Sequence, residues 1–251
     1  MIGFGFSRLR LGEIFGIPVY LDWSTIILAL MFLQTGSILF AAGLTVVLLA
    51  SIVLHELGHS LTARCFGCNT RDITLTVIGG CASLECMPRK AWQEFLTAAA
   101  GPFVSIVLGI SLLFAAAVMR DGNMLGEVLW SGGVINIGLA LFNLLPGFPM
   151  DGGRIFRSAL RLVLSRAKAT YVAMVVGRVA AALLVLGPLL GINHIWIIPI
   201  GGSFLLRALI AWMIWREGYR EYQVALAEEN WSRWTQADFE AKVSPPPYDR
   251  D

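Results

Sequence analysis

The sequence contains few charged residues. Asp, Glu, Lys and Arg make up 14% of its 251 residues, whereas hydrophobic residues make up 57%. Ordinary soluble domains are about 25% charged, and a globule of this size cannot hide so large an apolar excess from water. Several apolar runs approach or exceed the ~20 residues that a helix needs to cross a bilayer. The composition excludes an ordinary soluble domain and predicts an all-α polytopic membrane protein.

Other scarcities exclude further classes of protein. A formal net charge of +2 is too small to indicate a nucleic-acid partner. Four cysteines are too few for a disulfide scaffold. Near the N-terminus, no short apolar core ends at a small-residue cleavage site, so no removable signal peptide is expected.

About six apolar segments are predicted to cross the membrane as helices. Polar residues and glycines mark their ends. Basic residues are depleted from short loops that are translocated across the membrane. With the N-terminus inside, Arg120 is the only basic residue in the outer turns, so we expect a multi-pass cell-membrane protein with both termini in the cytoplasm. The predicted spans cover residues 17–35, 38–63, 92–119, 125–145, 171–191 and 195–215.

Two segments on the expected inner side differ from the spans. Residues 70–87 are rich in β-branched residues around Gly79-Gly80, which predicts a small re-entrant β-hairpin near the inner face, against protein or a wet cavity. Residues 155–168 place basic residues among leucines, as in a helix lying along the interface. We expect residues 1–216 to form a six-helix membrane domain, and residues 217–251 a cytoplasmic tail with a disordered end.

The second predicted span carries His55, Glu56 and His59 in an H-E-x-x-H pattern. Residues four apart share one helical face, so the two imidazoles can hold one cation, and Glu56 can reach a water on it. An ionisable residue near the bilayer centre costs on the order of 3 kcal/mol, so three such residues by chance are disfavoured. The pattern predicts a zinc site with a general base.

A catalytic zinc usually takes three protein ligands and leaves one position open. Asp151 follows the fourth span in a segment whose prolines and glycines prevent a regular helix and can turn a carboxylate inward. Zn²⁺ with two neutral histidines, ionised Asp151 and ionised Glu56 carries no net charge, which favours its burial. Asp151 is therefore the preferred third ligand, and Asp22 in the first span is the less favoured alternative.

These motifs resemble the site-2 proteases, a family of zinc intramembrane metalloproteases. The resemblance rests on His55-Glu56-x-x-His59 and on Asn143-x-x-Pro146 leading to Pro149-x-Asp151-Gly152, with weaker matches at Gly79-Gly80 and Ala100-Gly101-Pro102, and covers about residues 37–155. It implies one Zn²⁺ per chain on His55, His59 and Asp151, with Glu56 as the base and Asn143 polarising or placing the substrate. The implied activity is hydrolysis of a peptide bond within or beside a transmembrane segment of a substrate.

Alternatives remain open at this level. A metal-ion transporter or channel could use the same His/Asp site, and a silent scaffold could bind membrane helices without cutting them. Glu56 favours the protease, because hydrolysis requires a base and ion transport does not. The hairpin at 73–84 could accept an extended substrate by strand addition or could simply plug the cavity. Asn143 could orient substrate or bond a neighbouring helix. The expected partners are a transmembrane protein or peptide substrate and membrane lipid, and no regulatory partner can be named.

The cysteines fall on the expected inner side. Cys65-x-x-Cys68 and Cys81-x4-Cys86 do not have the spacing of a four-cysteine zinc ribbon. Thiols stay reduced in the cytosol. We expect ordinary thiols here, with a second metal site or a redox switch as the alternative.

Overall fold

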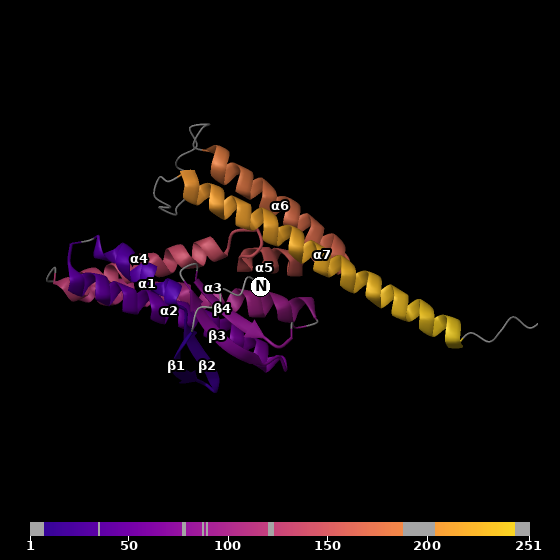
Figure 1. Ribbon diagram of the computed structural model, residues 1–251, viewed down its shortest axis with the longest axis horizontal. Coiled ribbons are helices and arrows are strands. Elements are labelled where there is room, and N and C mark those ends of the chain that lie inside the picture. Colours follow the sequence, from indigo (N-terminus) through magenta and orange to yellow (C-terminus); the bar gives the residue numbers. More distant parts are fainter. Residues whose placement is uncertain are drawn as a thin grey trace, which may run out of the picture.

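The structure is a computed structural model that describes residues 8–34, 36–76, 79–86, 88, 90–119, 123–187 and 204–243. Helices dominate it, and a small sheet lies beside them (Figure 1). In chain order the elements are β1 (Leu9–Ile14), β2 (Ile17–Leu21), a 3-10 turn (Trp23–Thr25), α1 (Ile26–Leu33), α2 (Ile38–Cys65), β3 (Thr70–Thr76), β4 (Gly79–Leu84), α3 (Ala91–Val118), α4 (Met124–Asn143), α5 (Asp151–Leu160), α6 (Arg166–Leu186) and α7 (Phe204–Val243).

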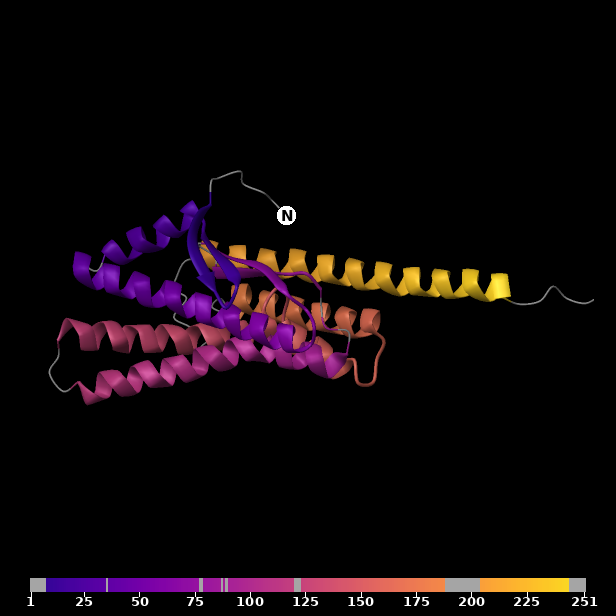
Figure 2. The same ribbon diagram turned by 90° about the horizontal axis from the view of Figure 1, so that it is seen from below.

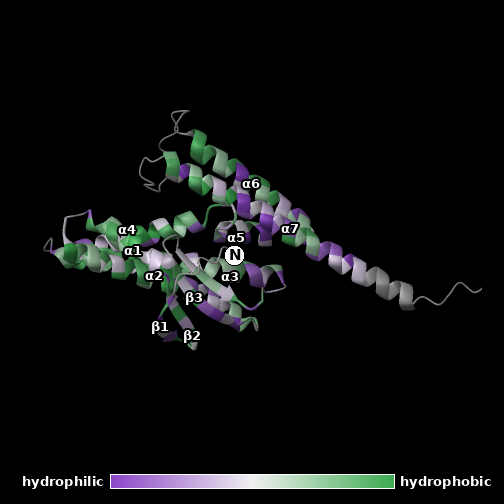
Figure 3. Cartoon of the chain, viewed as in Figure 1, coloured by the Kyte–Doolittle hydropathy of each residue, from purple (hydrophilic) through white to green (hydrophobic). Residues whose placement is uncertain are grey.

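Four of the described helices, α2, α3, α4 and α6, are long and apolar enough to cross a membrane. They lie at four of the predicted spans. Large apolar side chains on them face outward, and Ile38 and Phe114 are 75% and 71% exposed, as a lipid-facing surface requires. Apolar residues cover much of α1–α4, whereas polar residues are common along the C-terminal part of α7 (Figure 3).

The first predicted span, 17–35, is wrong. Residues 17–21 form strand β2, and the helix that follows, α1, has eight residues. At ~1.5 Å per residue, such a helix is roughly 12 Å long and is too short to cross the bilayer by itself. The sixth predicted span begins outside the described residues, because 195–203 are not among them. From Phe204, α7 continues as one helix through Val243, beyond the predicted end at 215.

The predicted hairpin at 70–87 is present as β3 and β4, within a sheet of order β1-β2-β3-β4. The strands β1 and β2 were not expected. β2 pairs with β3 in parallel, with Val19 opposite Ile73, and the other neighbours are antiparallel. One face of the sheet packs on α2 (Figure 2). Val19, Ile73 and Leu75 of the sheet there join Ile52 and Leu57 of α2 in a buried apolar cluster. This packing holds β4 close to the H-E-x-x-H segment.

The predicted interface helix at 155–168 is divided in the structure. α5 ends at Leu160, and α6 begins at Arg166 after Ser165, whose hydroxyl caps its N-terminus. α5 packs against α3 on one side and α6 on the other, while α6 and α7 lie side by side (Figure 1). Short α5 therefore joins the α6–α7 pair to the α2–α4 bundle.

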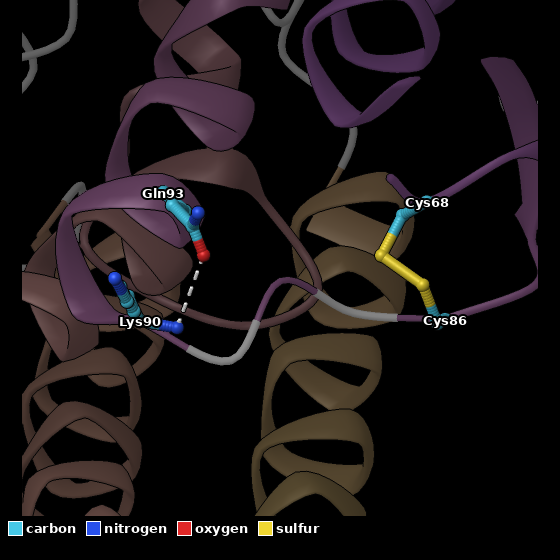
Figure 4. The surroundings of a disulfide bond; sticks show 4 residues. All are labelled: Cys68, Cys86, Lys90 and Gln93. Atoms are coloured by element: carbon cyan, nitrogen blue, oxygen red, sulfur yellow. Dashed lines mark hydrogen bonds between the residues drawn. A yellow bond between two sulfur atoms is a disulfide. The ribbon is translucent and has the colours of Figure 1, made fainter. Parts of the chain in front are cut away.

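The expectation of ordinary thiols is wrong for two of the cysteines. Cys68 and Cys86 form a disulfide, whereas Cys65 and Cys81 are free and exposed. The bond joins the chain just after α2 to the chain just after β4 (Figure 4). The spacing of the four cysteines does not predict which two form a bond, because that depends on the hairpin bringing its two ends together.

Candidate metal centre

The two histidines of α2 and the aspartate that begins α5 lie together. Asp151 Oδ2 is 3.3 Å from His55 Nε2 and 3.2 Å from His59 Nε2, and the two Nε2 atoms are 3.2 Å apart. All three residues are buried. Residues 96 apart in the sequence thus form a triangle of ligand atoms with nearly equal sides.

The size and chemistry of this triangle fit Zn²⁺. Ligands ~2.0–2.1 Å from a tetrahedral zinc ion are separated from one another by roughly 3.3–3.4 Å. Two imidazole nitrogens and one carboxylate oxygen form the donor set typical of a catalytic site, which leaves the fourth position for water or substrate. The expected cluster of His55, His59 and Asp151 is therefore present among the described residues and can bind a metal ion.

The second nitrogen of each imidazole contacts α3. His59 Nδ1 lies 2.7 Å from the backbone carbonyl of Thr97, to which it can only donate, so its proton is on Nδ1 and Nε2 is free for the metal. His55 Nδ1 lies 2.9 Å from the Ser105 hydroxyl. Such partners fix the tautomer and the ring orientation of metal-binding histidines. No sequence motif pointed to Thr97 or Ser105, although each lies about one helical turn from Gly101.

Gly101 allows α3 to approach the imidazoles closely. A Cβ atom at this position would lie 2.2 Å from His59 Nε2 and 2.7 Å from His55 Nε2. Any side chain here would occupy the space where the ligand atoms converge. The close packing of α3 on the imidazoles thus explains why a glycine stands in the middle of the weak Ala100-Gly101-Pro102 match.

Two further glycines place Asp151. The loop after α4 turns the chain, and α5 begins at Asp151 itself. A Cβ atom on Gly152 would lie 2.3 Å from the carbonyl oxygens of Leu144 and Leu145, and one on Gly153 would lie 2.7 Å from the carbonyl carbon of Gly147. The start of α5 can therefore pack directly on this loop, which directs the carboxylate towards α2.

Glu56 contacts the hairpin instead of the three ligand residues. The backbone N–H of Ala82 donates to Glu56 Oε2 at 3.1 Å. A Cβ atom on Gly80 would lie 2.5 Å from Glu56 Cγ, so glycine is needed for β4 to come this close. The hairpin thereby sets the position of the carboxylate expected to act as the base.

A cavity of about 280 Å³ connects these groups. Asn143, the last residue of α4, faces it, while its amide donates to the carbonyl of Leu139 in its own helix. Asp22, the alternative ligand, instead accepts from the Ser24 N–H and begins the 3-10 turn. The cavity lining includes His55, Glu56, His59, Gly79, Gly80, Cys81, Ala82, Asn143, Asp151 and Arg154.

Comparisons with known proteins agree with this geometry. The model of Peptidase family M50 matches residues 43–122 and 118–187. A Synechocystis protein is 35% identical over an alignment of 254 positions that covers 95% of this chain and 66% of that protein. A zinc metalloprotease of Methanocaldococcus jannaschii is 39% identical over 195 residues, which are 76% of this chain and 56% of that protein. The chain thus spans less than two thirds of the length of either relative.

The structure is similar to that of a site-2 protease from Methanocaldococcus jannaschii. The TM-score is 0.60 at 33% sequence identity, and the match covers 86% of this chain and 95% of the other. These findings confirm the family resemblance and the expectation of zinc, and they give no support to a metal transporter or channel. With its buried His-His-Asp cluster, the chain belongs to peptidase family M50, the family of the site-2 proteases and a family of metalloproteases.

Proposed function

We propose that this protein is a zinc-dependent endopeptidase that hydrolyses peptide bonds within or beside transmembrane segments of membrane proteins. The observation that carries the proposal is the buried triangle of His55, His59 and Asp151, which opens to a cavity shared with Glu56. A binding site for a structural metal would be closed by a fourth protein ligand. The family of the chain and its apolar helices support a membrane substrate.

The proposed roles follow from the positions of the side chains. His55, His59 and Asp151 would hold the ion, which would supply a Lewis acid and favour ionisation of a water. Glu56 is the group that would take a proton from the attacking water and pass it to the leaving nitrogen. The Ala82 N–H restricts the Glu56 carboxylate to one side of the cavity. Asn143, which lines the same cavity, places the substrate carbonyl.

A substrate segment must be extended before it is cut, because a helix keeps its carbonyls in hydrogen bonds. β4 forms one edge of the described sheet, and Gly79, Gly80, Cys81 and Ala82 also line the cavity. We propose that an unwound substrate segment adds to this edge as a further strand, with its backbone bonded to β4. The small side chains of β4 leave room for such a segment.

The proposed setting is the cell membrane, with both termini in the cytoplasm. In this arrangement residues 1–216 form the membrane protease domain and residues 217–251 the cytoplasmic tail, of which 244–251 lie outside the described residues. The Cys68–Cys86 bond then lies on the cytoplasmic side. Disulfides persist mainly in oxidising compartments. If the two cysteines are reduced in cells, that result supports this orientation, and if they are oxidised, it contradicts it.

The experiment that tests the function compares wild type with Glu56→Gln at equal zinc content. Purified full-length protein in detergent is incubated with a panel of transmembrane peptides, and products are identified by mass spectrometry. We expect cuts within or beside the apolar segment in wild type, and a loss of rate by a factor of about 10²–10⁴ in the variant, because a general base is removed. Equal rates in the two proteins would reject Glu56 as the base. If wild type cleaves no peptide of the panel, the proposed activity is contradicted.

A further inference from the structure

The Arg157 side chain forms ion pairs with both groups of helices. Its side chain, on α5, is 1% exposed. Nε donates to Oε1 of Glu94 on α3 at 2.8 Å, and Nη2 donates to the same oxygen. Nη1 donates to Oε2 of Glu221 on α7, also at 2.8 Å. One guanidinium thus connects the α2–α4 bundle to the α6–α7 pair.

The cluster is neutral as a whole. Arg161, the residue directly after α5, donates to the other oxygen of Glu94, so two arginines face two glutamates. Buried ion pairs are often no more stabilising than apolar side chains of similar volume. A gain in stability therefore does not explain why Arg157 is buried. A buried ion pair can instead favour one arrangement of the helices around it.

The same residue touches the segment that carries the aspartate ligand. The guanidinium lies over the ring of Phe148, 5.0 Å from its centroid, and Phe148 is 1% exposed. Phe148 precedes Asp151 by three residues, and Arg157 follows it by six. The chain on both sides of the carboxylate is thus held by one side chain.

Glu94, the partner of Arg157 on α3, lies close to the residue that bonds His59. Glu94 precedes Thr97 by three residues, which places both on one face of the first turns of α3. The Thr97 carbonyl receives the hydrogen bond from His59 Nδ1. The Glu94–Arg157 pair therefore joins the segment that orients His59 to the segment that presents Asp151.

We propose that Arg157 is a positioning residue that holds Asp151 in register with His55 and His59, through Glu94 on one side and Glu221 on the other. The proposal rests on the metal centre proposed above. Without the guanidinium, α5 can shift relative to α3, and the aspartate oxygen leaves its place in the triangle. Partners outside the ligand shell typically change metal affinity by about 10–100-fold.

The test uses the metal as its probe, so it does not depend on a substrate. The full-length chain is purified as wild type, Arg157→Met, Arg157→Lys and Glu221→Gln. Zinc affinity is measured by competition with a chelator, and the visible spectrum of the Co²⁺-substituted protein reports the geometry of coordination. Arg233→Met is the matched control, because it breaks an exposed ion pair to Glu229 within α7.

We expect Arg157→Met to lose at least tenfold in zinc affinity and to change the Co²⁺ spectrum. Arg157→Lys should be intermediate, since one ammonium cannot reproduce the planar fork that reaches both glutamates. Glu221→Gln should lose a smaller factor, and Arg233→Met should stay within twofold of wild type. Partial rescue by lysine separates a positioning role from a general loss of packing.

Wild-type affinity and spectrum in a folded Arg157→Met protein would overturn the proposal. If that variant does not fold, Arg157→Lys and Glu221→Gln decide, and the proposal fails if both match wild type. A wild-type protein that binds no zinc would overturn both this proposal and the metal centre. Normal zinc binding with the expected pattern of losses, but no cleavage of any peptide, would contradict the proposed protease function and leave the positioning role supported.

Discussion

The Ala82 N–H donates to Glu56 Oε2 at 3.1 Å, which joins the edge strand of the sheet to the proposed base. This contact depends on Gly80, two residues earlier in β4, where a Cβ atom would lie 2.5 Å from Glu56 Cγ. A single methyl group added at position 80 would therefore disturb both the hairpin and the Glu56 carboxylate.

Gly80→Ala is expected to lower peptide cleavage at least tenfold while zinc binding is retained. The added methyl must displace Glu56, Ile52 or β4, because the three atoms nearest to it belong to Glu56 and Ile52 and not to the ligand residues. Cleavage rate and zinc content are measured on the same preparation. Gly138→Ala on α4 is the matched control, because a Cβ atom there meets nothing within 4 Å. Wild-type cleavage by Gly80→Ala would contradict the role of the hairpin.

Ser105→Ala is expected to weaken zinc binding by about 10–100-fold, because it removes the partner of His55 Nδ1 and frees the imidazole to rotate. The measurement is chelator competition. Ser111→Ala on the same helix is the control, since its exposed hydroxyl donates to the carbonyl of Val107 one turn earlier. Equal zinc affinities in the two variants would show that Ser105 does not orient the histidine.

Replacing Cys68 and Cys86 with serine is expected to destabilise the hairpin. The bond closes a loop with a sequence separation of 18, and the chain-entropy estimate for a loop of this size is roughly 3 kcal/mol. Limited proteolysis between β3 and β4 and thermal unfolding both report the effect. Cys65→Ser, at a free and exposed cysteine, should leave both unchanged. Labelling of all four cysteines in the native, oxidised protein would contradict the disulfide.

Glu221 should make stability depend on pH in the acidic range. Burial opposes its ionisation, but the Arg157 guanidinium outweighs this and, with Arg154 and Arg166, lowers the pKa of Glu221 below its ordinary value of 4.5. A group with a lowered pKa in the folded state contributes stability above its unfolded pKa, and that contribution is lost as the pH falls through the folded pKa.

Thermal unfolding should therefore show a steeper loss below pH 4.5 in wild type than in Glu221→Gln, with parallel curves above it. Both proteins contain the same other carboxyl groups, so the difference between the curves isolates Glu221. Glu217→Gln, on the same helix and in contact with exposed Arg220, is the control and should follow wild type. Parallel curves for wild type and Glu221→Gln at all pH values would contradict the assignment.

Much of the site could be predicted from the sequence, because ionisable side chains cost free energy to bury in lipid and so stand out when they occur there. His55, Glu56 and His59 stand out within an apolar run, and the charge of the cluster favours a carboxylate such as Asp151 as the third ligand. The partners of the imidazoles could not be predicted in this way. A serine hydroxyl and a backbone carbonyl on α3 are common features of any helix, and only the crossing of α2 and α3 selects them.

The sheet was predicted only in part for a related reason. Residues 70–84 contain β-branched residues and a glycine pair, which indicate a hairpin without reference to the rest of the chain. β2 lies at the start of a long apolar run, where a strand and the beginning of a span have the same composition. Its assignment depends on pairing with β3, about fifty residues later, so no local pattern identifies it.

The parallel pairing of β2 with β3 also fixes which parts of the chain share a compartment. β2 precedes α2 and β3 follows it, yet Val19 lies opposite Ile73. Hydrogen-bonded strands cannot lie on opposite sides of a bilayer, so the chain between β2 and α2 must return across the depth that α2 spans, with α1 covering only part of it. Reporter groups attached before β2 and after β4 should consequently face the same solution in either insertion of the protein, and one placed between α3 and α4 should face the other.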